Sequence, residues 1–586
     1  MPSSTARSIL CFTALLPARP SGQAERRSRV LRPKDRPSER SGRRLAILAC
    51  LTLCLAAGPG AGPAVGDPLQ RAPAPVIAVG DVTAESAVLW VQADREGVAL
   101  IDLTEAPPEV AALQADAERE HDRNRDPDRD HARAQDRPPE VAGPLAAPSR
   151  HFEVPLSARS DFTAKLRIDG LNPGMVQHWR AAVQGASDVL GEQARGRFRT
   201  APAAYTAAAV HLRWGSDLAG QNVCRDAERG FEVFDAIHDG APDLFVGLGD
   251  MIYADGRCEA VGIYGNAQIP TSFGPATDLA GFRAHWRYTR ADMGLRRLLS
   301  QTAYYTVWDD HEVIKALGPL HDAHEQPPYT AGVSLMPIGM AALLEQNPIA
   351  EHPLTPKRLY RSVRWGQHLE LLLLDTRQYR DPNQAEDTPE RPKTMLGREQ
   401  LTWLKTRLEE SRATWVVVAS SVPMSLSERA PEAVGRDGWA NVDGATGYAR
   451  ELAAILEHAA THGRNNLVFI SGGVRFGAAL RYRPFSERPG FVVHEFLAPP
   501  LSAAIRREAD IDPDLGVERL FLHAPASGQD IRQYEQARDW FGFGELRIDG
   551  AGLLSAALRG ADGRLLHELR LSPASPMRLA AIGFRP

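Results

Sequence analysis

The sequence lacks a marked excess of positive charge. Its 586 residues include 68 Lys and Arg against 73 Asp and Glu, which gives a formal net charge of -5. Proteins that bind the phosphate backbone of nucleic acids usually carry a broad basic face. This composition therefore disfavours nucleic-acid binding as the main role, although it says little about small anionic substrates.

The sequence also lacks a comfortable membrane span, because its N-terminal apolar run, Leu45–Ala57, is short. Arg43 and Arg44 precede this run, and small residues follow it over Gly58–Gly66. This order is typical of an export signal, and the paired arginines favour a twin-arginine signal. We therefore predict a leader over residues 1–66 and a periplasmic, cell-surface or extracellular location. An uncleaved anchor, or a start placed too early, would give the same pattern.

Cysteine is scarce, and three of the five cysteines lie within the predicted leader. Only Cys224 and Cys258 remain after it. In an oxidising compartment these two can form a disulfide, and two buried free thiols fit the sequence equally well. Each follows shortly after a candidate metal ligand described below, so a disulfide would brace that site.

The chain shows no repeat at solenoid spacing, and its pattern changes once. Strand-like runs separated by turn clusters predict a small β-sandwich, similar to a fibronectin type III-like module, over residues 74–203. Residues 105–150 interrupt it, and their centre has almost no apolar side chains, which predicts a disordered insertion. Over residues 204–575, short apolar runs alternate with helical stretches. This alternation predicts an α/β domain whose strands are buried on both faces.

Acidic residues follow two of the predicted buried strands. Asp217 ends the run Trp-Gly-Ser-Asp, and Asp250 follows the apolar run Leu244–Leu248. Tyr253 comes three residues after Asp250. Ligands collect at the carboxyl ends of parallel strands, and carboxylate and phenolate oxygens suit hard cations. We therefore predict that Asp217, Asp250 and Tyr253 bind a metal ion.

A third group of ionisable residues follows another strand-like run. Asp309, Asp310, His311 and Glu312 are consecutive, and a protein core does not tolerate such a group unpaired. The alternative is a helix N-terminus with capping acids. We favour a functional role, with His311 and Asp310 as candidate catalytic residues.

Six motifs in this order and spacing resemble those of the PhoD-like alkaline phosphatases. They are Trp-Gly-Ser-Asp (214–217), Gly-Asp-x-Ile-Tyr (249–253), Trp-Asp-Asp-His-Glu-Val (308–313), Leu-Asp-Thr-Arg-Gln-Tyr-Arg (374–380), Leu-Gly-Arg-Glu-Gln-Leu-x-Trp-Leu (396–404) and Glu-Phe-Leu-Ala-Pro-Pro-Leu-Ser (495–502). The resemblance implies a four-layer α/β/β/α metallophosphoesterase core that hydrolyses phosphate mono- and diesters with iron and calcium. It also implies roles: Asp217 is the first iron ligand, Asp250 bridges the metals and Tyr253 binds Fe³⁺. His311 serves the phosphoryl group or the leaving oxygen.

Three positions depart from the family pattern. Lys315 stands near the place of an asparagine ligand, Gly473 replaces an aspartate and Arg475 replaces a histidine. The iron ligands are thus kept, whereas binding of calcium is doubtful. Lys315 and Arg475 would bring positive charge to the second metal position. Arg475 is also a candidate catalytic residue, since a guanidinium can make two parallel hydrogen bonds to a phosphate.

These departures leave three interpretations. The protein is an exported phosphoesterase weakened by loss of second-metal ligands, or a catalytically inactive paralogue that binds phosphate or phosphoesters. In the third, it is an enzyme that recruits other ligands, among them His494, Asp255 or Asp375. For His494, we expect a hydrogen-bonded core position instead.

Two further arginines, Arg377 and Arg380, lie in the fourth motif. Either could clamp a phosphate, but a salt bridge to Asp375 or Asp381 is the more ordinary use of such a residue. We therefore expect both to lie outside the site.

Overall fold

The computed structural model describes residues 73–106, 149–185, 189–318, 332–426, 437–441, 445–507 and 511–574. The predicted leader and nearly all of the predicted insertion over 105–150 lie outside these ranges, and both stay predictions. Of the helices within the described ranges, none combines the length and the apolar character needed to cross a membrane.

The larger sheet carries the first two candidate ligands. Its order is β21 (Leu565–Leu571), β20 (Leu554–Gly560), β19 (Gly542–Ile548), β8 (Val210–Leu218), β9 (Leu244–Leu248), β10 (Ala303–Val307), β1 (Val76–Gly80), β2 (Ser86–Gln92) and β5 (Thr163–Asp169), and β17 (Pro500–Ser502) also pairs with β8. Strands β8, β9 and β10 are parallel neighbours. Their carboxyl ends therefore meet at one edge of the sheet, as the sequence pattern predicts.

A second sheet of seven strands packs against the first. Its order is β11 (Arg361–Trp365), β12 (Leu369–Leu373), β13 (Trp415–Ser420), β14 (Leu467–Ser471), β16 (Val493–Leu497), β15 (Gly477–Tyr482) and β18 (Val517–His523). Every residue of β12, β13 and β14 is buried. Their largely apolar sequence agrees with this burial, because both faces of each strand are covered.

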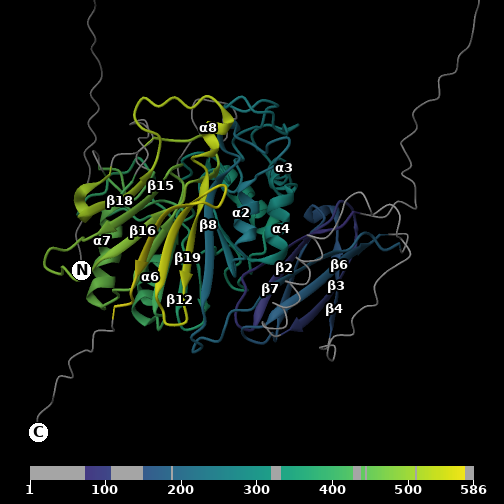
Figure 1. The fold of residues 1–586 in the computed structure, drawn as a ribbon, viewed down its shortest axis with the longest axis horizontal. Helices are drawn as coiled ribbons and strands as arrows, with labels where there is room; N and C mark the ends of the chain where they lie inside the picture. Colours follow the sequence, from purple (N-terminus) through teal and green to yellow (C-terminus); the bar gives the residue numbers. More distant parts are fainter. Residues whose placement is uncertain are drawn as a thin grey trace, which may run out of the picture. The chain divides into compact units, whose positions relative to one another are not determined.

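Three hydrophobic clusters define the layers. The first lies between the two sheets and joins Leu248 of β9 to Leu371 and Val417 of β12 and β13. The second joins the outer face of the larger sheet to α2 (Val233–Asp239), α3 (Leu279–Arg290), α4 (Met293–Gln301) and α5 (Gly332–Gln346). The third joins the outer face of the smaller sheet to α6 (Gly397–Glu410) and α7 (Ala449–Thr461). Figure 1 shows α6 and α7 on one side of the sheets and α2, α3 and α4 on the other. The order helices, sheet, sheet, helices is the layering that the family resemblance implies.

Three of the N-terminal strands belong to the larger sheet and do not form part of a separate sandwich. Strands β1, β2 and β5 extend the larger sheet, and β1 pairs in parallel with β10. The other strands form a separate four-stranded sheet in the order β4 (Arg150–Leu156), β3 (Gly97–Ala106), β6 (Val176–Gln184) and β7 (Ala194–Arg199). Side chains of both groups share the first hydrophobic cluster. The domain boundaries and the fibronectin type III likeness stay predictions.

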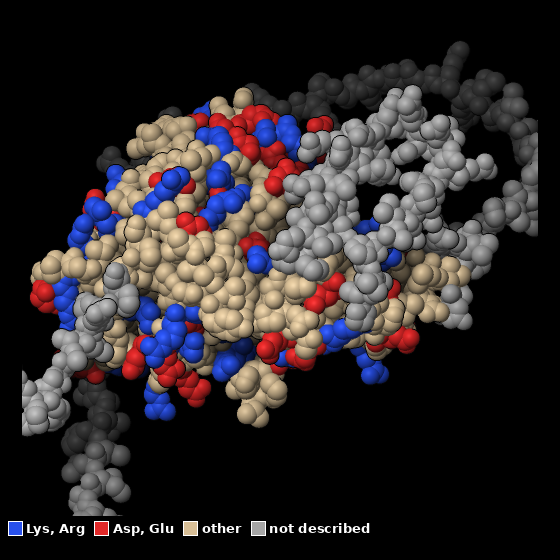
Figure 2. Space-filling view, turned by 60° about the horizontal axis from the view of Figure 1, so that its bottom comes forward, with Lys and Arg blue, Asp and Glu red and all other residues tan. Residues whose placement is uncertain are grey.

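Basic and acidic side chains are interspersed over the face of the molecule drawn in Figure 2. No continuous basic surface is visible among the described residues of that face. This mixed surface agrees with the near balance of charges in the sequence.

His285 on α3 provides a pH-dependent contribution to stability. Its side chain is buried, its Nε2 lies 3.2 Å from the carbonyl oxygen of Gly274, and burial lowers its pKa to about 4. The unfolded chain therefore binds a proton near pH 6.5 that the folded chain does not bind. We expect His285 alone to lower the free energy of unfolding by about 2 kcal/mol between pH 7 and pH 5.

Urea unfolding at the two pH values tests this prediction. His285→Gln keeps a hydrogen-bond donor but cannot titrate, so its loss between pH 7 and pH 5 should be smaller than that of the wild type. Equal losses in the two proteins would contradict the assignment.

Candidate active site

The ends of β8 and β9 place two buried carboxylates side by side. Asp217 and Asp250 are 1% and 2% exposed, and both have left-handed backbones, with φ of 60° and 53°. Such a conformation is costly for a residue with a side chain and persists where the surrounding structure enforces it. The two residues line a pocket that opens to solvent. The same pocket is lined by the other four predicted site residues, Tyr253, Asp310, His311 and Arg475.

The three predicted metal ligands converge. The Tyr253 hydroxyl donates to Asp217 Oδ1 at 2.9 Å and lies 3.4 Å from Asp250 Oδ2. Burial raises the pKa of Asp217, and burial together with the charge of Asp310 raises that of Asp250 well above its usual range. Bringing several carboxylates together in a buried place is unfavourable unless a cation neutralises them. The all-oxygen donor set fits one hard cation.

His311 is held at the pocket wall by two contacts. Its ring Nδ1 lies 2.8 Å from Oδ1 of Asp255, and its ring stacks on that of Tyr253 with 4.1 Å between centroids. Burial lowers the pKa of His311, but the carboxylates of Asp255 and Asp310 outweigh it and raise the value to about 9. Since Nδ1 is engaged by Asp255, Nε2 is the ring atom left for chemistry in the pocket.

Asp310 lies close to the predicted metal ligand Asp250. Three possible ligand atoms, one each from Asp250, Asp310 and His311, lie within 4.8 Å of one another. The Asp310 carboxylate accepts hydrogen bonds from the backbone N–H groups of His311 and Ala316. Asp310 and His311, two of the three predicted catalytic residues, can therefore act on a substrate or share a cation with Asp250.

Glu312 links the chain segments that follow β9 and β10. It is 1% exposed, and its carboxylate accepts from the backbone N–H groups of Asp309, Asp250 and Met251 at 2.7, 2.9 and 2.7 Å. Burial raises its pKa to about 7. The sequence places Glu312 only within an ionisable cluster. Its role as an acceptor for three backbone donors becomes visible only in the structure.

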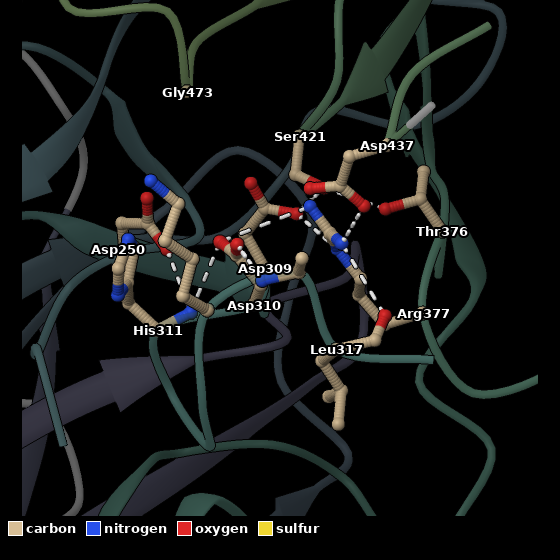
Figure 3. A network of polar contacts seen from close by, with 12 residues as sticks. Asp250, Asp309, Asp310, His311, Leu317, Thr376, Arg377, Ser421, Asp437 and Gly473 are labelled. Carbon is tan, nitrogen blue, oxygen red and sulfur yellow. Dashed lines mark hydrogen bonds and ion pairs between the residues drawn. The ribbon is translucent and has the colours of Figure 1, made fainter. Parts of the chain in front are cut away.

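Arg377 lies in the site, contrary to the expectation from the sequence. It is 1% exposed and lines the pocket, with Nε 2.5 Å from Asp309 Oδ1 and Nη1 2.6 Å from Asp437 Oδ1. Figure 3 shows its guanidinium between these two carboxylates. Arg380 also pairs with Asp437, at 2.6 Å. The expected partner Asp375 instead accepts a hydrogen bond from the indole of Trp308. The available signal was the position of Arg377 four residues after the end of β12.

Gly473 offers no side chain to the pocket and has a left-handed backbone. Its φ is 76°, and its N–H donates to Asp217 Oδ2 at 3.1 Å. A Cβ atom added at this position would lie 2.8 Å from the carbonyl oxygen of Ser421 and 3.2 Å from Asp309 Oδ2. The local backbone is therefore shaped for glycine.

Replacing Gly473 by alanine should lower the free energy of unfolding by about 2 kcal/mol, because the residue keeps a positive φ and crowds the Ser421 carbonyl. Gly490→Ala is the matched control, since a Cβ there meets no atom within 4 Å. Chemical unfolding of both variants checks the difference. Similar stabilities of the two variants would contradict the prediction.

The other residues considered from the sequence fall into those that line the pocket and those that do not. Arg475 lines the pocket, whereas the side chain of Lys315 is exposed and lies outside the pocket lining. Only one of the two expected positive charges therefore reaches the pocket wall. Of the three residues considered as recruited ligands, Asp255 contacts His311, and His494 and Asp375 lie outside the lining. Burial lowers the pKa of His494 to about 4.

A disulfide links Cys224 and Cys258, with 5.9 Å between their Cα atoms. The interpretation as two free thiols is therefore wrong. The loop that it closes contains Asp250, Tyr253 and Asp255. The bond thus ties together the segment that supplies Asp250 and Tyr253 to the pocket and Asp255 to His311.

Comparison with known sequences identifies relatives of this chain. Residues 214–550, more than half of the chain, match the family described as PhoD-like phosphatase. Alkaline phosphatase D of Bacillus subtilis (strain 168) is 28% identical over 254 residues. This alignment covers 40% of the chain and 41% of the length of that relative.

Two solved structures share the fold. A structure of PhoD matches with a TM-score of 0.61 at 19% identity, over 86% of this chain and 94% of its own. A purple acid phosphatase from yellow lupin (Lupinus luteus) seeds matches with a TM-score of 0.51 at 11% identity, over 85% of this chain and 74% of its own. The match over residues 214–550, together with the six motifs and the layered fold, shows that the chain belongs to the PhoD-like phosphatase family.

Proposed function

We propose that this protein is an exported phosphoesterase that hydrolyses phosphate mono- or diesters with one tightly held Fe³⁺ ion and with Arg475 in the second metal position. One observation carries this proposal. Asp217, Asp250 and Tyr253 converge on one side of the pocket, and Arg475 lines the same pocket where the family pattern has a metal-binding histidine. Family membership supports phosphoester hydrolysis as the reaction class.

The ion would be held by Asp217, Asp250 and Tyr253. When bound, it supplies a Lewis acid that polarises a phosphoryl oxygen and lowers the pKa of a water. The guanidinium of Arg475 binds phosphoryl oxygens through two parallel N–H groups and balances their charge. His311, oriented by Asp255, presents Nε2 to the leaving oxygen and donates a proton there.

A second cation would meet a poorer set of donors. Gly473 contributes no side-chain oxygen, and Asp309 Oδ1 already accepts from Arg377 Nε and from Ser421 Oγ at 3.0 Å. For this reason the proposal includes iron and leaves calcium out. The same observation favours the second candidate function, an inactive paralogue that binds phosphate or a phosphoester through Arg475.

Export is part of the proposal and rests on the N-terminal sequence pattern. The disulfide between Cys224 and Cys258 supports it, because such bonds persist in oxidising compartments. We therefore place the mature protein in the periplasm, at the cell surface or in the medium.

The test compares wild type and Arg475→Ala in hydrolysis of p-nitrophenyl phosphate and bis(p-nitrophenyl) phosphate, with and without added Fe³⁺ and Ca²⁺. We expect turnover that follows an iron content of about one per chain. We expect a fall in kcat/KM of about 100-fold in Arg475→Ala, as for loss of a charged group that stabilises the transition state. Arg483→Ala is the control, since Arg483 is half-exposed and pairs with Glu518.

The possible outcomes separate the candidates. Equal kcat/KM for wild type and Arg475→Ala would overturn the role of Arg475. Wild-type protein with no turnover on either substrate, but with phosphate binding that Arg475→Ala abolishes, would establish the inactive paralogue instead. Turnover that requires calcium would contradict the one-metal proposal.

A further inference from the structure

The ends of α6 and α7 bring together two histidines and a glutamate on the outer helix layer, on the side of the sheets where Figure 1 shows both helices. Glu409 lies in the last turn of α6, His458 in the last turn of α7, and His462 directly after α7. The two histidines are four residues apart and share one face of the helix. None of the three residues lines the pocket of the candidate active site.

The three side chains point at one another. His458 Nε2 lies 3.9 Å and His462 Nε2 lies 3.8 Å from the same oxygen, Oε2 of Glu409. The two imidazole rings are 4.1 Å apart between centroids. These distances are too long for hydrogen bonds and lie at the outer limit of an ion pair, so a surface ion pair alone would hold the three side chains weakly.

The spacing is close to that of ligands around a transition metal ion. With metal to nitrogen distances of 2.0–2.1 Å, tetrahedral ligand atoms lie about 3.3 Å apart. Among the described residues, this trio is one of the groups whose ligand atoms all lie within 4.8 Å of one another. Small side-chain rotations would therefore bring the three atoms to bonding distance from a common centre.

The hydrogen bond of the His462 ring favours one of its two nitrogens as the ligand atom. His462 Nδ1 lies 2.8 Å from the backbone oxygen of His458, so it carries the proton and leaves the lone pair on Nε2. Ligating histidines commonly donate their other ring N–H in this way. His458 Nε2 lies 3.1 Å from the backbone oxygen of Lys405. A bound ion would replace the proton that His458 Nε2 donates there.

The backbone around the trio is held in place. Arg464, two residues beyond His462, donates to the carbonyl oxygen of Leu408 at 2.8 Å and to that of Ser411 at 2.7 Å. These bonds tie the end of α6 to the chain that leaves α7. The ligands are thus presented by fixed elements, which favours ion binding because little order must be gained.

We propose that Glu409, His458 and His462 form a surface site for a divalent transition metal ion of the zinc type. Two imidazole nitrogens and one carboxylate oxygen are ligands that such ions prefer, with water in the remaining position. The ion would cross-link the ends of α6 and α7 and stabilise the outer helix layer. This site is separate from the iron position in the pocket and does not rest on the proposed function.

Histidine labelling by diethyl pyrocarbonate, read by peptide mass spectrometry on the mature protein, tests the proposal. Zinc should protect His458 and His462 from labelling. His352, an exposed histidine that is not part of the trio, should react equally with and without zinc. Equal labelling of His458 and His462 in both conditions would overturn the proposal.

A binding measurement gives a second, independent readout. In an Asp250→Asn background, which weakens the pocket site, zinc should raise the melting temperature. His462→Gln should lower the zinc affinity at least about 10-fold, and Glu409→Gln should lower it less. His352→Gln is the matched control. A zinc-induced shift that survives in the double variant His458→Gln, His462→Gln would place the ion elsewhere and overturn the site.

Discussion

Asp250→Asn should abolish iron binding and lower kcat/KM at least about 1,000-fold, because it removes a central ligand of a buried site. Asparagine tolerates the left-handed backbone that φ of 53° requires, so the variant should fold. Iron analysis and phosphoester hydrolysis measure the two effects. Asp235→Asn, on an exposed side chain of α2, is the control.

In the metal-free protein, we expect Asp250→Asn to leave the free energy of unfolding unchanged or to raise it. Burial and the neighbouring carboxylates of Asp310, Asp309 and Asp217 raise the pKa of Asp250 well above its usual range, so its charge is unfavourable without a cation. Replacing it by a neutral amide removes that repulsion. The metal-free variant should therefore be at least as stable as the metal-free wild type. A clear loss of stability, or unchanged iron content, would contradict this account of the site.

The double variant Cys224→Ser, Cys258→Ser should lose about 4 kcal/mol of unfolding free energy, the expectation for a disulfide that closes a loop of this length. The two cysteines are 34 residues apart. Urea unfolding of the variant, and of wild type treated with dithiothreitol, checks the value from two directions.

A single substitution distinguishes the contribution of the disulfide bond from that of the packing of the two side chains. Cys224→Ser alone breaks the same bond, so it should cost nearly as much as the double variant. A loss below about 1 kcal/mol in the double variant would show that the bond contributes little to stability. Loss of iron binding together with stability would show that the loop also positions Asp250 and Tyr253.

Those parts of the fold whose signal is local could be predicted from the sequence. Apolar runs at 244–246, 369–374, 415–419 and 467–470 predict strands, and the stretches 398–412 and 447–461 predict helices. Strands β9, β12, β13 and β14 and helices α6 and α7 lie within a few residues of these stretches. The proximity of Asp217 and Asp250 could be predicted as well, since parallel strands bring their carboxyl ends to one edge of the sheet. A short apolar run identifies a buried strand without any knowledge of its neighbours.

Contacts between distant segments could not be predicted in this way. Arg377 and Asp437 are 60 residues apart, and nothing in either local sequence indicates that they pair. The pairing of β1 with β10 crosses more than 200 residues, and the sequence pattern shows only that both are strands. The positions of Lys315 and Arg475 differ for a similar reason: both are cations, and only the backbone decides which one reaches the pocket.

The pairing of β1 with β10 has a practical consequence for expression of the phosphatase region alone. The family match begins at residue 214, which invites a truncation that omits β1, β2 and β5. Such a chain would leave β10, every residue of which is buried, with a row of unpaired backbone N–H and C=O groups along one side. Exposed apolar strand edges of this kind promote aggregation between molecules. Soluble material should therefore be sought from chains that begin before Val76, rather than at the boundary that sequence similarity marks.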